Sequence, residues 1–100
     1  MKRVYKYEKR IDDFVVFNLP VGAVILHIDI QKITYDAPVC LWALVDPNVI
    51  ATEKRTIRIA GTGHPIEDFG VENKYINTFT VGSAKELWFH AFEVKEHENG

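Results

Sequence analysis

The residues best suited to chemistry lie in one short stretch, IAGTGHPIEDFG. Gly61 and Gly63 can adopt positive φ angles and let a ligand approach the backbone closely. The amides of Thr62 to His64 would then form a concavity for an anion. The stretch is not a P-loop, because the lysine is absent, and a dinucleotide fingerprint would need a third glycine in place of Ile66. Two interpretations stay open: a turn between strands, or one wall of a ligand site.

Two arginines precede this stretch and two tryptophans flank it in the sequence. The planar guanidinium groups of Arg55 and Arg58 suit phosphate or carboxylate oxygens. The indole rings of Trp42 and Trp88 can stack on a nucleobase. The alternative for the arginines is a solvated face that forms ion pairs with surface carboxylates. The predicted binding residues for a small nucleotide-derived ligand are Trp42, Arg55, Arg58, Gly61, Thr62, Gly63, His64, Trp88 and His90.

The histidines do not show the spacing of a metal site. His27, His64, His90 and His97 lack a paired motif such as H-E-x-x-H, and no cysteine pair accompanies them. We therefore predict neither a metal nor another cofactor. His90 shares a strand face with Trp88, so it is either part of the site or a buried, hydrogen-bonded histidine. The sequence also lacks G-x-S-x-G, which favours binding over catalysis. A metal-free phosphodiesterase that uses His64 and His90 is the enzymatic alternative.

Length and composition indicate one domain over residues 1–100. The net charge is −2, so bulk electrostatics give no reason to expect a nucleic-acid polymer or a membrane as partner. No apolar stretch is long enough to span a bilayer, and the N-terminus lacks the apolar segment of a signal peptide. The single cysteine, Cys40, lies in an apolar run and is predicted to be a buried thiol. These features predict a cytoplasmic protein.

The elements that must position these residues are short strands separated by turn residues. No convincing helix of three turns appears, and the connections are short. The pattern predicts an all-β fold, an antiparallel sandwich or small barrel of about seven strands. The strand segments are VYKYEK, FVVFNLP, AVILHIDIQKI, VCLWALV, KRTIRIAG, YINTFTV and LWFHAFEV. In the third segment, alternation predicts that Val24, Leu26, Ile28 and Ile30 share one face.

Two of these segments, VCLWALV and LWFHAFEV, are apolar on both faces. Such strands are typical of a position between two covering layers. The alternative is a second face that lines a pocket or is covered by another copy of the chain. Since a chain of this length has limited means to cover these faces, we predict a homo-oligomer.

Three blocks, LWALVDP, RTIRIAGTGHPI and LWFHAFEV, resemble a family of small phage and prophage proteins of unknown function. The resemblance implies a phage origin and a compact β fold, and it supplies no catalytic residues. In size and expected oligomerisation the chain is similar to phage proteins that sequester nucleotide signals of bacterial defence, of the Thoeris or CBASS type.

This resemblance implies an anti-defence protein that binds a cyclic ADP-ribose-type signal or a cyclic dinucleotide without cleaving it, in the cytoplasm of an infected bacterium. The first alternative is a virion or assembly component that acts through a homo-oligomeric interface. The second is a phosphodiesterase for such a signal.

Overall fold

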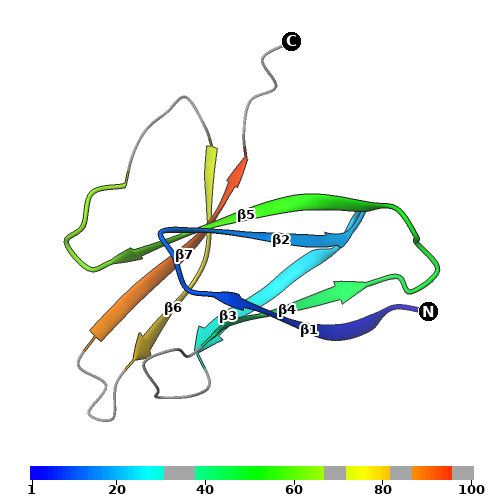
Figure 1. The fold of residues 1–100 in the computed structure, drawn as a ribbon, viewed down its shortest axis with the longest axis horizontal. Helices are drawn as coiled ribbons and strands as arrows, with labels where there is room; N and C mark the ends of the chain where they lie inside the picture. Colours follow the sequence, from blue (N-terminus) through cyan, green and yellow to red (C-terminus); the bar gives the residue numbers. More distant parts are fainter. Residues whose placement is uncertain (31–37, 67–71, 82–86, 96–100) are drawn as a thin grey trace.

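All seven predicted strands form, and they pair into two antiparallel sheets (Figure 1). The structure is a computed structural model. It describes residues 1–30, 38–66, 72–81 and 87–95. The strands are β1 (Arg3–Arg10), β2 (Phe14–Pro20), β3 (Val24–Ile30), β4 (Pro38–Val45), β5 (Thr52–Gly61), β6 (Glu72–Val81) and β7 (Leu87–Lys95).

The sheets form a sandwich, which confirms one of the two predicted architectures. The small sheet has the order β1-β4-β3, and the large sheet has the order β2-β5-β7-β6. The two sheets contact each other mainly where β3 faces β6 and where β1 approaches β2. Among the described residues, no helix is long and apolar enough to cross a membrane.

Alternate residues on the facing sides of the sheets build the core. In β2 the odd positions Val15, Phe17 and Leu19 are buried, whereas the even positions from Phe14 to Asn18 are exposed. Period-two burial is expected for a sheet with one face inside and one outside. Most of the other core residues come from β4 of the small sheet and from β5 of the large sheet, with single residues from β6 and β7. They are Val39, Leu41, Ala43, Val45, Ile57, Ile59, Phe79 and Ala91.

The alternation predicted for β3 is wrong at its beginning. Ile28 is completely buried and Ile30 packs against the core, as predicted, but Val24 and Leu26 are about half exposed. The pairing of β3 with β4 shifts register between Ile25 and His27. A β-bulge adds one residue to a strand and reverses the alternation beyond it. Ile25 therefore faces inward in place of its two neighbours.

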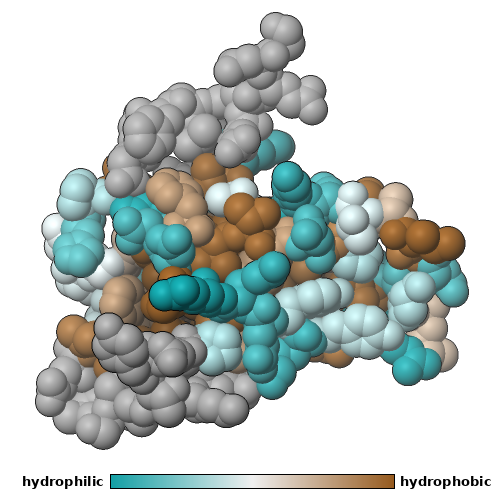
Figure 2. Space-filling model, viewed as in Figure 1, coloured by the Kyte–Doolittle hydropathy of each residue, from teal (hydrophilic) through white to brown (hydrophobic). Residues whose placement is uncertain are grey.

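No third layer covers β4 or β7 within the described parts of the chain. Among the described residues the sandwich consists of two sheets, so the structure gives no second covering layer to either strand. The second face of β4 carries half-buried Trp42, and that of β7 carries Trp88, which is 53% exposed. Figure 2 shows further hydrophobic surface at the end of the molecule near the N-terminus and the β4–β5 connection.

Candidate functional site

The GTGH residues form a tight turn directly after β5. The His64 amide donates to the Gly61 carbonyl at 3.0 Å, and Gly63, the third residue of the turn, has a φ of +87°. A positive φ at this position suits glycine. The Thr62 amide donates to the Trp88 carbonyl at 3.2 Å. The predicted concavity of consecutive amides is therefore not formed, because the turn and the β7 backbone engage two of the three amides.

A hollow lies between this turn and the start of β7. Its volume is about 470 Å³, within the range of small-molecule sites. Its lining residues are Gly61, Thr62, His64, Leu87, Trp88 and Phe89. We call it the Trp88 hollow. It combines an exposed indole and apolar side chains with a hydroxyl and an imidazole.

Gly61 is needed for the position of His64 beside this hollow. A Cβ atom built on Gly61 would lie 3.0 Å from two atoms of the His64 ring, which is closer than ordinary contact. By contrast, a Cβ atom on Gly63 would meet nothing within 4 Å. The two glycines of the motif therefore have different roles: Gly61 admits the imidazole and Gly63 permits the turn.

His90 lies beside the hollow on the outer face of β7, with a hydroxyl on each ring nitrogen. Its Nε2 is 2.8 Å from Thr62 Oγ1, and its Nδ1 is 2.9 Å from Thr78 Oγ1. Thr78 Oγ1 is in turn 2.7 Å from the hydroxyl of Tyr75. His90 is thus held in a defined orientation and connected to the hollow through Thr62.

Arg58 holds the chain that follows the turn. It lies on the outer face of the large sheet, yet it is only 6% exposed. Its guanidinium carbon is 5.1 Å from the centre of the Phe14 ring, a cation–π contact. It donates to the Ile59 carbonyl at 2.8 Å and to the Pro65 carbonyl at 3.3 Å. Arg58 therefore anchors the backbone on both sides of the turn.

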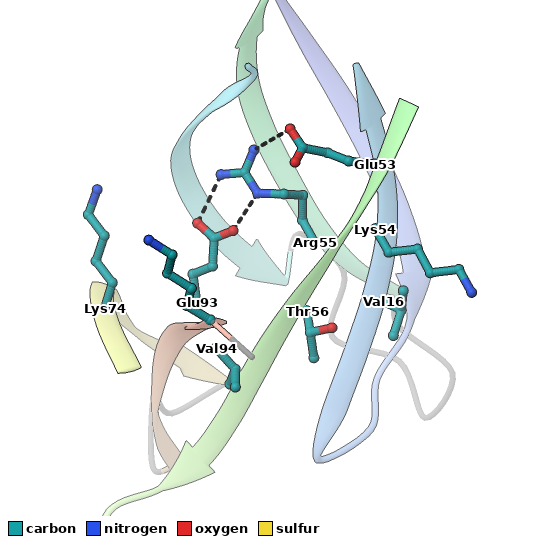
Figure 3. A pocket seen from close by; sticks show the side chains of 9 residues that line it. Val16, Glu53, Lys54, Arg55, Thr56, Lys74, Glu93 and Val94 are labelled. Carbon is teal, nitrogen blue, oxygen red and sulfur yellow. Dashed lines mark hydrogen bonds and ion pairs between the residues drawn. The ribbon is translucent and has the colours of Figure 1, made fainter. Parts of the chain in front are cut away.

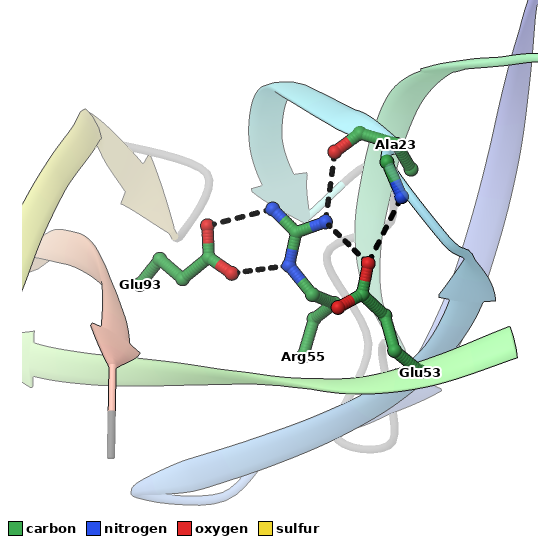
Figure 4. Close-up of polar contacts among 5 residues, drawn as sticks. Ala23, Glu53, Arg55 and Glu93 are labelled. Atoms are coloured by element: carbon green, nitrogen blue, oxygen red, sulfur yellow. Dashed lines mark hydrogen bonds and ion pairs between the residues drawn. The ribbon is translucent and has the colours of Figure 1, made fainter. Parts of the chain in front are cut away.

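Arg55 lies on the opposite, inner face of β5. It makes a bidentate ion pair with Glu93 and donates to the Ala23 carbonyl at 2.7 Å (Figure 4). Glu53 is 3.9 Å from Arg55 and accepts a hydrogen bond from the Gly22 amide at 3.0 Å. The hydrogen bond to Glu93 raises the pKa of Arg55, against the opposing effect of burial. Arg55 thus connects the large sheet to the start of β3.

A second hollow, of about 790 Å³, surrounds this ion pair. Figure 3 shows that Arg55, Glu53 and Glu93 point toward one another, whereas Lys54 and Lys74 extend away on opposite sides. The lysines therefore do not converge with Arg55 on one point. The acidic partners of Arg55 make this hollow a weaker anion site than the arginine alone would suggest.

The structure brings together most of the predicted site residues but not all of them. Gly61, Thr62, His64 and Trp88 line one hollow, Gly63 completes the turn, and His90 bonds to Thr62. Arg58 supports this turn, whereas Arg55 lies on the other face of β5. Trp42 belongs to the small sheet, where its ring centre is 5.7 Å from that of His27.

Sequence reasoning missed Tyr75 and Thr78, which complete the contacts of His90. These two residues are three apart, so simple alternation would place them on opposite faces. A register shift between Tyr75 and Asn77 brings both to the outer face. The pairing of Thr78 with His90 is a cross-strand relation that no single strand pattern reveals.

No group of three or more His, Cys, Asp or Glu residues in the described ranges could hold a metal ion. Cys40 is buried, as predicted. Neither a curated protein nor a solved structure matches the chain. One family does match it, over residues 1–100, and the chain belongs to that family, which is described as a domain of unknown function, DUF7352.

Proposed function

We propose that this protein binds a nucleotide-derived small molecule in the Trp88 hollow and does not cleave it. The observation that carries the proposal is the composition of this hollow: the half-exposed indole of Trp88 shares it with the Thr62 hydroxyl and the His64 imidazole. A nucleobase stacks on an exposed indole, which contributes about 1–3 kcal/mol per base. The hydroxyl and the imidazole supply hydrogen bonds to ribose or phosphate oxygens.

The proposed biological role is sequestration of a bacterial immune signal by a phage protein. The resemblance of the LWALVDP, GTGHPI and WFHAF blocks to small phage proteins supports a phage origin. In this role the ligand is a cyclic ADP-ribose-type molecule or a cyclic dinucleotide, and the protein acts in the cytoplasm of the infected host. Sequestration requires a pocket with affinity for the signal and no reaction.

Calorimetry with a panel of nucleotides tests the proposal. We expect binding by the wild type, and a ten- to hundred-fold loss in Trp88→Ala, from the roughly 1–3 kcal/mol of one stacked base. Trp42→Ala is the matched control, because Trp42 lies on the other sheet, and it should bind normally. Equal losses in both variants would contradict the assignment of the site.

Chromatography of the ligand after heat denaturation separates binding from catalysis. A sequestering protein returns the nucleotide intact. Recovery of a cleaved product would favour the phosphodiesterase instead, which would use His64 and His90.

A second candidate function, a phage virion or assembly subunit, is favoured by an apolar patch on the outer face of the small sheet. We call it the Trp42 patch. Its residues are Val4, Val24, Leu26, Trp42 and Leu44. Two pairs of polar side chains flank it. Lys6 Nζ lies 3.2 Å from Glu8 Oε1, and His27 Nε2 lies 3.9 Å from Asp29 Oδ2. Because both signs of charge border the patch, a second copy can place opposite charges against each other.

Light scattering at micromolar concentration tests this homo-oligomer. We expect a mass above that of the monomer for the wild type and a monomer for Val24→Lys, because a charge is placed in the apolar contact. Val16→Lys is the control, since Val16 is similarly exposed but lies on the large sheet. A monomeric wild type would rule out the proposal.

A further inference from the structure

Four polar side chains form a continuous chain across the outer face of the large sheet and end at the Trp88 hollow. The order is Tyr75, Thr78, His90 and Thr62, with successive contacts of 2.7, 2.9 and 2.8 Å. Thr62 is the member that lines the hollow. Tyr75, at the other end, is 55% exposed.

The number of protons in this chain constrains its hydrogen bonds. Each of the three hydroxyls carries one proton, and a neutral imidazole carries one on nitrogen. The three contacts use three of these four protons. One proton is therefore left over, and it lies on Thr62, on Tyr75 or, because a hydroxyl can accept two bonds, on Thr78.

These arrangements give Thr62 one of two opposite roles. If the bonds run from Tyr75 toward the hollow, Thr78 donates to Nδ1 of His90 and Nε2–H donates to Thr62. The Thr62 hydroxyl then has its own proton available for a ligand. If Nδ1 of His90 carries the proton instead, Nδ1–H donates to Thr78, Thr62 donates to Nε2, and Thr62 can only accept from a ligand.

The chemistry of the end groups favours the first arrangement. A phenol is more acidic than an aliphatic hydroxyl, so it is the stronger donor and the weaker acceptor. Tyr75 therefore donates to Thr78. A Thr78 hydroxyl that accepts from Tyr75 is polarised into a stronger donor, which favours donation from Thr78 to Nδ1 over acceptance of a second bond from Nδ1–H.

We propose that the Tyr75–Thr78–His90 chain makes Thr62 a hydrogen-bond donor toward the Trp88 hollow. The hollow then selects ligands that present an acceptor oxygen there, such as a phosphate oxygen. This inference rests on the proposed function, because it specifies which group of the ligand Thr62 contacts. His90 is a positioning residue, since it acts on the ligand through Thr62.

The ¹⁵N resonances of the His90 ring in the ligand-free full chain test the direction of the bonds. We expect Nε2 to be protonated and Nδ1 unprotonated. Thr78→Val removes the Nδ1 partner and should shift both resonances toward a mixture of tautomers. Thr80→Val is the matched control on the same strand, and it should leave them unchanged. A protonated Nδ1 in the wild type, or an unchanged spectrum in Thr78→Val, would overturn the proposal.

Binding of AMP and adenosine tests the selection, because these probes differ only in the phosphate. Thr62→Val should weaken the binding of AMP about ten- to a hundred-fold, as expected for the loss of one hydrogen bond to a charged acceptor. It should weaken the binding of adenosine much less. Equal losses for both probes would overturn the acceptor assignment. If no nucleotide binds the wild type, the proposed function fails, and the tautomer of His90 still decides the direction of the bonds.

Discussion

At the scale of single residues, the GTGH motif shows why two glycines are needed where a simple turn needs one. Gly63 has the positive φ, and the His64 ring lies 3.0 Å from the position that a Cβ atom on Gly61 would take. The sequence indicates that glycines permit unusual geometry, but it does not distinguish backbone conformation from close approach. Both requirements appear only when the turn and the imidazole are placed together.

Alanine at each glycine should separate these roles. Gly63→Ala should cost about 1–2 kcal/mol of stability, because alanine is strained at this φ. Gly61→Ala should change stability less, since only the His64 ring must move, but it should weaken ligand binding. Thermal unfolding and calorimetry on both variants provide the measurements. The opposite ranking, with Gly61→Ala the less stable protein, would show that the turn depends on Gly61.

At the scale of elements, strand positions follow from the sequence but faces do not always follow. All seven strands form where turn residues and apolar runs predict them. Alternation alone also predicts the side of the sheet on which Arg55 lies. Arg55 is two residues before Ile57 in β5, so both side chains face inward. The faces of β3 and β6 could not be predicted, because each has a register shift set by its partner strand.

Two alanine variants in β3 test its bulge. Ile25→Ala should destabilise the protein by about 2 kcal/mol, because Ile25 packs against the core. Leu26→Ala should cost well under about 1 kcal/mol, because Leu26 is 47% exposed. Urea unfolding measures both. Simple alternation predicts the reverse order, so a larger loss in Leu26→Ala would argue against the bulge.

At the scale of the whole molecule, polar contacts join the two sheets in addition to the apolar core. Arg55 and Glu93 belong to the large sheet, and their ion pair lies against the backbone that enters β3 of the small sheet. Asn77 of β6 makes a similar connection, with two hydrogen bonds of 2.8 Å to the backbone of Ile28. These contacts fix how the sheets are aligned, which apolar packing alone specifies less strictly.

Removing the charge of Glu93 should weaken this connection. Glu93→Gln should cost about 1.5–3 kcal/mol, the range for hydrogen bonds to a charged group, because the Arg55 guanidinium loses its bidentate partner. Glu53→Gln is the control and should cost less, since its contact with Arg55 is 3.9 Å long. Chemical denaturation measures both, and equal losses would contradict a special role for Glu93.

The half-buried phenol of Tyr7 makes the stability of the fold sensitive to alkali. Burial raises the pKa of Tyr7 above its ordinary value of 10.0, with a smaller contribution from Tyr5. The folded protein therefore retains this proton more strongly than the unfolded chain. The stability that the neutral Tyr7 phenol contributes is fully present below about pH 10. It is lost as pH rises through the pKa that Tyr7 has in the folded protein. Tyr7→Phe should reduce this alkaline loss in unfolding measurements.

The two bulges have a consequence for how the molecule meets its own copies during folding and at high concentration. Exposed strand edges invite pairing with other chains, and bulges, proline and basic side chains discourage it. The edge strands here are β1, β3, β2 and β6. β3 and β6 carry the bulges, β2 ends in Pro20, and β1 has four basic residues in RVYKYEKR. Each of these four edge strands, as far as the structure describes them, thus carries a feature that discourages edge-to-edge aggregation.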